Sequence, residues 1–277
     1  MTADEILETP DLIAAGVAGD EVRRRMHGAR ATFVRVFEVH VDVPLESLPH
    51  AAQPGEVRII GTPASLGTAV DAVRAARAVA STVPVTGFSV ADLAALGPLE
   101  NVVRHLKDAG LLAVAHLPLD LVVDAERAAR EVRQAGLTIN AITLHELDDH
   151  ARMAICERAR ALQASVGGFK AFAPLPRAMS IAKPTTGYDD VKMVALARVV
   201  CDNIPSIQVD WQLYGPKMAQ VALTVGADDV DNVSAMDPGV LGTRRSPLEE
   251  IKRNITAAAL QPVERDGLFG DRQEMRA

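Results

Sequence analysis

Short apolar runs alternate along the chain with longer segments of helical periodicity. The first run, 33–43, has hydrophobic residues on one face and Glu38, His40 and Asp42 on the other. Alternation of period two predicts a strand, and recurrence every three to four residues predicts a helix. Further strands are predicted at 57–61, 83–89, 111–117, 137–144, 168–173, 207–211 and within 226–232. Helices are predicted at 66–80, in segments that follow the third strand and reach Ala109, and at 122–134, 148–163, 189–202, 216–225 and 247–260.

Eight strands separated by helices predict an α/β architecture with a parallel sheet. We expect it to close as a (β/α)8 barrel of the TIM-barrel type, with some irregular or shortened segments. Residues 1–30 form a helical lead-in, and 31–277 form a single barrel domain that ends in a C-terminal helix and a charged tail. The basic run Arg23–Arg25 in the lead-in is interpreted as a solvated helix face.

Composition narrows the class of protein. Hydrophobic residues make up 48% of the 277 positions but aromatic residues only 3%, so we expect a large aliphatic core. The net charge of −7 argues against a nucleic-acid or anionic-membrane partner. The two cysteines fall in predicted helices and suggest no disulfide framework. Since we find no signal peptide and no apolar run that could cross a bilayer, we expect a soluble cytoplasmic protein.

Candidate site residues are the polar side chains at predicted strand ends, because barrel enzymes carry their chemistry at the carboxyl ends of strands. As catalytic candidates we select His145, His116, His40 and Glu38. As substrate-binding candidates we select Asp42, Asp120, Glu146, Lys170, Asp210, Trp211 and Asp229. Asp210 and Trp211 are adjacent on one strand, so only one of them can face the lumen. Trp211 is expected to be a core or pocket-wall residue.

Histidines and carboxylates at strand ends could in principle bind Zn²⁺ or iron. No compact ligand spacing such as HExxH supports such a site, so we predict no metal. Two other interpretations stay open. The polar groups form a lining for a small organic acid, or they form an internal hydrogen-bonded network.

Several motifs resemble a known family in order and spacing. DDVK, ARVVCDNIP, VDW, AQVAL and GADDVDN, all within 187–232, resemble the C-terminal part of the radical-SAM aminofutalosine synthases. Those enzymes belong to the futalosine route to menaquinone, and their relatives build deazaflavin cofactors. DEVRRRMHG at 20–28 and PVERDGLFG at 262–270 extend the likeness to both ends, so we expect the chain not to be a fragment. The resemblance implies a radical-SAM-type barrel with a 4Fe–4S cluster and S-adenosylmethionine.

The residues that would hold those cofactors are missing. The family carries CxxxCxxC in the loop after its first strand, where three thiolates bind three irons. The corresponding loop, 44–56, contains no cysteine, and Cys156 and Cys201 lie far from it in the sequence. The family's glycine-rich stretch for S-adenosylmethionine corresponds to 115–120, where only the carboxylate of Asp120 persists. We therefore expect no cofactor.

Two further positions bear on the resemblance. His145 precedes Gly167–Phe169 by the same number of residues as a histidine of the family precedes its own GGF motif. The loop 174–184 lacks another family histidine and is basic through Arg177 and Lys183.

Three functions remain open. The chain is a cluster-less homologue that binds a small carboxylated or nucleoside-like metabolite, or that supports an active enzyme of menaquinone-related metabolism. As a second reading, it is a barrel enzyme re-purposed for acid/base or metal-assisted chemistry, with His40, His116 or His145 as base. As the third and weakest, it is a radical enzyme with cluster ligands elsewhere. Its partners would be a small molecule and either a second copy or a related active enzyme. The sequence leaves open whether the chain is catalytic.

Overall fold

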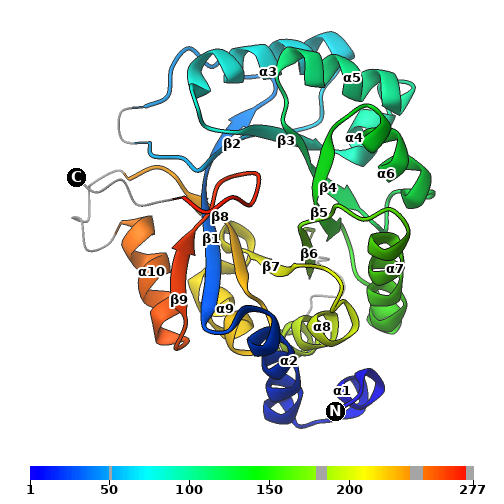
Figure 1. Cartoon of the computed structure of the whole chain (residues 1–277), viewed down its shortest axis with the longest axis vertical. Coiled ribbons are helices and arrows are strands. Elements are labelled where there is room, and N and C mark those ends of the chain that lie inside the picture. The colour runs from blue at the N-terminus through cyan, green and yellow to red at the C-terminus, as the bar shows by residue number, and fades with distance from the viewer. Residues whose placement is uncertain (50–51, 179–185, 238–245, 273–277) are drawn as a thin grey trace.

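The computed structural model describes residues 1–49, 52–178, 186–237 and 246–272. Eight parallel strands form a closed barrel, since neighbours pair in chain order and β1 pairs with both β2 and β8 (Figure 1). The strands are β1 Arg30–His40, β2 Glu56–Ile60, β3 Val85–Ser89, β4 Ala113–Pro118, β5 Thr138–Leu144, β6 Ala171–Pro176, β7 Ser206–Asp210 and β8 Asp229–Ser234. The predicted barrel is confirmed.

Helices surround the barrel on its outside (Figure 1). They are α3 Leu66–Ala80, α4 Val90–Ala94, α5 Leu99–Ala109, α6 Ala125–Gln134, the 3₁₀ turn η1 Asp149–Ala151, α7 Arg152–Ser165, α8 Gly187–Val200, α9 Trp211–Thr224 and α10 Pro247–Ala257. Side-chain caps fix several starts: Ser65 accepts from the amide of Thr68, and Asp124 accepts from that of Arg127. Such caps satisfy amides that have no partner within the helix.

The helix predicted to begin at Pro216 begins five residues earlier. Asp210 accepts hydrogen bonds from the amides of Gln212 and Leu213, so it caps α9 directly after β7. Gly215, with φ of 72°, interrupts the helix before Pro216. The proline therefore opens the second half of α9 rather than the whole helix.

A ninth strand, β9 Gln261–Glu264, lies outside the closed barrel. It pairs in parallel with Arg30–Phe33, the amino half of β1, while Val36–His40 of the same strand pair with β2. The sequence predicts only a charged tail here. Because β9 runs parallel to β1 from its first residue, the chain that follows β9 begins near the amino end of the barrel.

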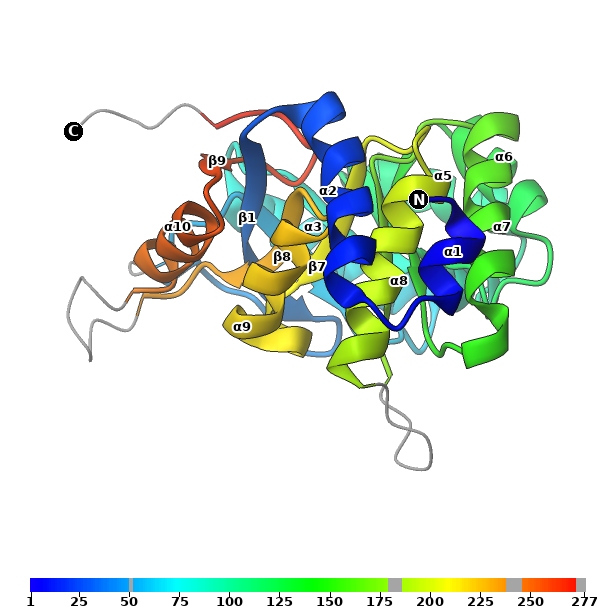
Figure 2. The same cartoon turned by 90° about the horizontal axis from the view of Figure 1, so that it is seen from below.

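The lead-in consists of α1 Ala3–Glu8 and α2 Leu12–His27, both beside α8 (Figure 2). Gly19 permits the close approach of α2, since a Cβ there would lie 2.2 Å from the carbonyl oxygen of Val225. The interpretation of Arg23–Arg25 as a solvated face is wrong for Arg23. That side chain is 2% exposed, pairs with Asp20 and donates to the carbonyl of Gly28. Because α2 packs against α8 and α9, its basic residues do not form a fully solvated face.

The main apolar core is aliphatic, as the composition predicts, and includes side chains from the barrel strands and the helices around them. Among the described residues, none of the helices is long and apolar enough to span a membrane. The inward faces of several strands differ from the apolar core, because they carry buried charged side chains.

Candidate functional site: a charged barrel interior

A chain of charged groups runs through the barrel interior, built from the first residues of β2 and the middle of β8. The Arg58 guanidinium donates to both oxygens of Glu56, at 2.7 and 2.8 Å, and to both oxygens of Asp231, each at 2.8 Å. All three side chains are buried. Thr86 on β3 donates a further hydrogen bond to Glu56. Bidentate pairs of this kind compensate for the loss of water around buried charges.

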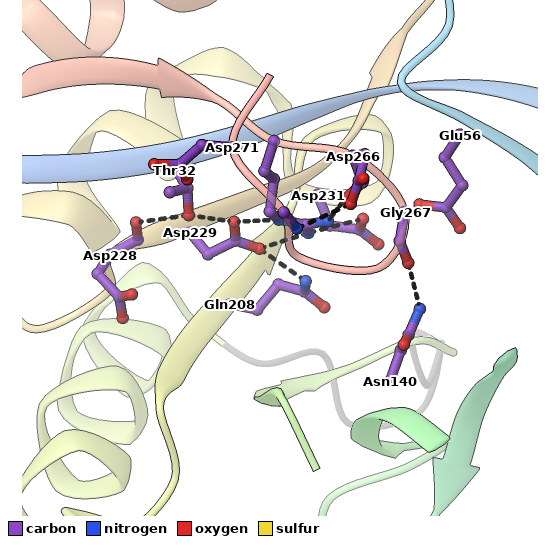
Figure 3. A network of polar contacts seen from close by, with 12 residues as sticks. Thr32, Glu56, Asn140, Gln208, Asp228, Asp229, Asp231, Asp266, Gly267 and Asp271 are labelled. Atoms are coloured by element: carbon purple, nitrogen blue, oxygen red, sulfur yellow. Dashed lines mark hydrogen bonds and ion pairs between the residues drawn. The ribbon is translucent and has the colours of Figure 1, made fainter. Parts of the chain in front are cut away.

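The chain of charges continues to a residue that follows β9. Arg265, which is 2% exposed, donates to both oxygens of Asp229 at 2.6 and 2.7 Å and lies 3.6 Å from Asp231. Thr32 and Gln208 also donate to Asp229 (Figure 3). Burial alone would raise the pKa of Asp231, but the charge and hydrogen bonds of Arg58, with the charge of Arg265, lower it. Asp231 is therefore a carboxylate at neutral pH.

Towards the carboxyl end of the barrel, His116 on β4 is near these charges. The residue is partly buried, and its Nδ1 is fully buried and has no hydrogen-bond partner among the described residues. Burial, followed by the charges of Arg177 and Arg58, holds the pKa of His116 well below its usual range, and Asp231 opposes this. The imidazole is therefore neutral at pH 7. A buried nitrogen without a partner is uncommon and marks a place where a ligand group could bind.

Asp210, Arg177 and Asn232 form a second polar group at this end. Arg177, whose side chain is 28% exposed, lies 3.3 Å from the Asp210 carboxylate. Asn232 Nδ2 donates to Glu38 at 3.0 Å and lies 3.5 Å from Asp210. Burial raises the pKa of Asp210, although the charge of Arg177 opposes the shift. A partly exposed guanidinium beside a buried carboxylate can bind an anionic or hydrogen-bonding ligand.

Comparison with known proteins gives this interior a context. Residues 169–276, which contain α8 to β9 and Arg265, match the family described as the CofH/MqnC C-terminal region. This part of the chain is therefore similar to the C-terminal region of that family. The predicted relation to the aminofutalosine synthases is confirmed, because relatives named aminodeoxyfutalosine synthase match as well.

Aminodeoxyfutalosine synthase of Thermus thermophilus is 32% identical over 211 residues, which cover 62% of this chain and 55% of that enzyme. A second relative of the CofH/MqnC region is the 5-amino-6-(D-ribitylamino)uracil–L-tyrosine 4-hydroxyphenyl transferase of Archaeoglobus fulgidus. It is 34% identical over 121 residues, 39% of this chain and 35% of that enzyme. The chain spans about half, or less, of the length of these curated relatives.

Solved structures share the barrel. The FeFe-hydrogenase maturase HydG superposes with a TM-score of 0.64 and 13% identity, over 94% of this chain and 71% of HydG. Methylornithine synthase (PylB) superposes with a TM-score of 0.61 and 11% identity, over 94% of this chain and 92% of PylB. At these identities the likeness concerns the fold alone.

The residues present do not fit the cluster that the CofH/MqnC resemblance implies. The segment that follows β1 contains no cysteine. Cys156 is buried in α7, and Cys201, at the end of α8, donates from Sγ to the Cys156 carbonyl at 3.2 Å. The hydrogen bond with Cys201, followed by burial, raises the pKa of Cys156, the opposite of what a thiolate ligand needs. In the described part of the chain, no three His, Cys, Asp or Glu side chains are grouped as metal ligands.

Four predicted site residues lie in the barrel interior, Asp229 at its amino end and the other three towards its carboxyl end: Glu38, His116, Asp210 and Asp229. The expectation that Asp229 lies at a carboxyl strand end is wrong, because it is the first residue of β8. The same expectation is wrong for Lys170, which immediately precedes β6 and therefore lies at the amino end. The turn 226–229 does mark the start of β8 in the sequence, whereas the start of β6 was predicted at 168, because apolar runs do not fix strand ends to one residue. Whether any of these residues binds a substrate stays a prediction.

The remaining predicted residues lie on exposed rims. His40 ends β1, and its ring lies against Gly61 and 3.7 Å from Asp42, with both side chains about half exposed. Asp120 accepts from the amides of His145 and Glu146, each at 2.8 Å, and all three residues are exposed. Asp120 thus joins the loop after β4 to the loop after β5. These contacts give the three residues a clear structural role.

Of the adjacent residues Asp210 and Trp211, only one faces the barrel interior. Trp211 is the first residue of α9, is partly buried and packs against the core, so Asp210 is the interior residue of the two. Lys183 lies outside the described residues, whereas Arg177 lies close to Asp210.

Four interior residues were not predicted from the sequence as site residues: Arg58, Asp231, Asn232 and Arg265. Two signals were available. Glu56 and Arg58 occupy alternate positions of β2, and Asp229 and Asp231 occupy alternate positions of β8. Each pair therefore shares one strand face. No comparable pattern singles out Arg265, because its partners lie more than thirty residues earlier, on another strand.

Proposed function

We propose that this chain binds a small carboxylated or nucleoside-like metabolite at the carboxyl end of its barrel, without radical-SAM chemistry. The observation that carries the proposal is the buried Nδ1 of His116, which has no partner among the described residues and lies within the influence of Arg177. A ligand that donates to this nitrogen would satisfy it, and such satisfaction contributes to affinity because an unpaired buried polar atom is costly.

Arg177 supports a carboxylated ligand. A guanidinium presents five N–H donors in a planar fork that matches a carboxylate. Arg177 is partly exposed and lies near Oδ2 of Asp210, whose Oδ1 accepts from two backbone amides, so the carboxylate remains fixed in place. The side chain can therefore keep this neighbour while it binds a ligand oxygen.

The family relation supports the nature of the ligand. One relative is named for aminodeoxyfutalosine, and another for a ribitylaminouracil and L-tyrosine. The cysteine-free segment after β1 argues that this chain does not carry out the radical chemistry that the resemblance implies. We therefore propose a cytoplasmic role in menaquinone-related metabolism, either as a metabolite-binding protein or as the partner of a related active enzyme.

A second candidate is non-radical acid/base catalysis. It is favoured by the neutral state of His116 at pH 7, which leaves the ring able to accept a proton. The two candidates share the same site and differ in whether a bound probe is converted.

Binding can be tested with aminodeoxyfutalosine and L-tyrosine as probes, by calorimetry and by the fluorescence of Trp211, the single tryptophan. Loss of one hydrogen bond to the ligand, charge-assisted at Arg177 and to a neutral ring at His116, should weaken binding by about tenfold or more in Arg177→Met and His116→Ala. Arg127→Met is the matched control, since that arginine is 75% exposed on α6. The proposal would be refuted if neither probe binds, or if the wild type and all variants bind with equal affinity. Conversion of a probe by the wild type but not by His116→Ala would favour the second candidate.

A further inference from the structure

The turn after β9, residues 265–272, closes the amino end of the barrel. The carbonyl of Gly267 accepts from Asn140 Nδ2 at 2.7 Å, and its amide donates to the carbonyl of Gly55 at 3.1 Å. A Cβ at Gly267 would lie 2.6 Å from Cγ of Glu56, so the backbone is in close contact with the charged interior. Figure 3 shows Gly267 of this turn bonded to Asn140, with Asp229 beyond the other side of the turn.

This turn supplies a buried charge. The Arg265 guanidinium donates to both oxygens of Asp229, and also to the carbonyl of Asp266 at 3.0 Å. The ring of Phe269 lies 3.8 Å from its central carbon, so the cation also has an aromatic face against it. Few donors of Arg265 are left without a neighbour, as a buried cation requires.

Charge balance makes Arg265 important beyond its own contacts. The connected interior group holds three carboxylates, Glu56, Asp229 and Asp231, and two guanidiniums, Arg58 and Arg265. One of the two cations therefore comes from the C-terminal turn rather than from the barrel. Without it, three buried carboxylates would share the single charge of Arg58.

The group reaches the opposite end of the barrel through one shared residue. Asp231 is held by Arg58 and also lies 3.6 Å from Arg265. The charged groups that act on His116 are Arg58 on β2, Asp231 on β8 and Arg177 after β6. Arg265 is therefore in contact with one of the charged groups that act on His116, and that group is held by another.

We propose that Arg265 is a positioning residue for the site at the carboxyl end of the barrel, which it influences through Asp231 and Arg58. The C-terminal turn is then part of the functional interior as well as its closure. The importance of His116 to a ligand rests on the proposed function, but the effect of Arg265 on His116 is measurable without any ligand.

The direction of the effect follows from charge. Removing the cation makes the interior more negative, and a more negative surrounding favours the protonated imidazole. The pKa of His116 should therefore rise in Arg265→Met, by about half a unit or more. Asp229→Asn combined with Arg265→Met removes one charge of each sign, so the pKa should return close to the wild-type value.

The experiment is an NMR titration of the histidine ring signals, with His116 assigned by comparison with His116→Gln. Arg30→Met is the control, since Arg30 pairs with Asp271 of the same turn but is 42% exposed. We expect a rise in Arg265→Met, recovery in the double variant, and no change in Arg30→Met. An unchanged pKa of His116 in folded Arg265→Met would overturn the proposal. A raised pKa that persists in the double variant would also overturn it.

If Arg265→Met does not fold, the charge-balanced double variant and Arg265→Lys take its place. Arg265→Lys keeps the charge but not the bidentate geometry, so the pKa of His116 should stay close to its wild-type value. A large shift in that variant would overturn the proposal. Because no ligand is present, failure of the metabolite probes to bind would not affect the result.

Discussion

Buried carboxylates in this barrel differ in protonation because their partners differ. Asp231 lies between two guanidiniums and has a lowered pKa, whereas burial raises the pKa of Asp210 despite Arg177. The sequence shows the alternation of Asp229 and Asp231 and so predicts that they share a face. It does not show that Arg58 and Arg265 meet them there, because those contacts join residues that are far apart in the chain.

We expect Asp231→Asn to lower the free energy of unfolding at pH 7 by about 3 kcal/mol or more, because Arg58 and Arg265 would lose a buried counter-charge. A lowered folded-state pKa stabilises the protein above the unfolded value of about 4, and this contribution is lost as pH falls through the folded-state pKa. The difference in free energy of unfolding between the wild type and the variant should therefore become smaller in acid.

Denaturant unfolding at pH 7 and at about pH 3 measures both effects. Asp71→Asn is the control, since that side chain is 79% exposed on α3. A variant that unfolds at the wild-type denaturant concentration at pH 7 would show that the Asp231 charge contributes nothing net.

At the scale of helices and strands, hydrophobic periodicity predicts the order of the barrel correctly, because each element has its own apolar pattern. The errors occur where distant residues meet. Arg23 is buried because α2 packs against the barrel helices, and β9 exists because Gln261–Glu264 pair with β1. Neither partner can be recognised from the local sequence. The start of α9 differs in kind, since the cap at Asp210 was locally visible but was assigned to the strand.

The docking of α2 gives a prediction for Gly19. Gly19→Ala should lower the free energy of unfolding by about 1–3 kcal/mol, because the new Cβ would lie 2.2 Å from a backbone oxygen that cannot move aside easily. Gly67→Ala is the matched control in α3. Its Cβ would meet only the Ser65 hydroxyl, at 3.6 Å, and alanine favours a helix over glycine.

Thermal unfolding of the two variants distinguishes local crowding from a general effect of glycine replacement. Gly67→Ala should be neutral or slightly stabilising. If Gly19→Ala is equally stable, α2 does not pack on the barrel as described.

At the scale of the molecule, fold and family could be predicted from the sequence, but the site only in part. Strand ends directed attention to His116, Glu38 and Asp210, which do lie in the interior. They also directed it to His145 and His40, which lie on exposed rims. A strand end fixes the edge of the barrel on which a residue lies, but not whether its side chain turns inward or outward.

The absence of the cysteine motif leads to a prediction about the whole protein. We expect anaerobic reconstitution with iron and sulfide to leave no stoichiometric iron on the chain after gel filtration, because a 4Fe–4S cluster needs several thiolates at one place. Cys156 and Cys201 are both buried, away from the segment after β1. Iron counting and visible absorbance measure the outcome, with a radical-SAM enzyme reconstituted in parallel. A double variant, Cys156→Ser with Cys201→Ser, separates specific from adventitious iron. About four irons per chain in the wild type, lost in the double variant, would show that the protein assembles a cluster from ligands that include these cysteines, and the non-radical proposal would then be wrong.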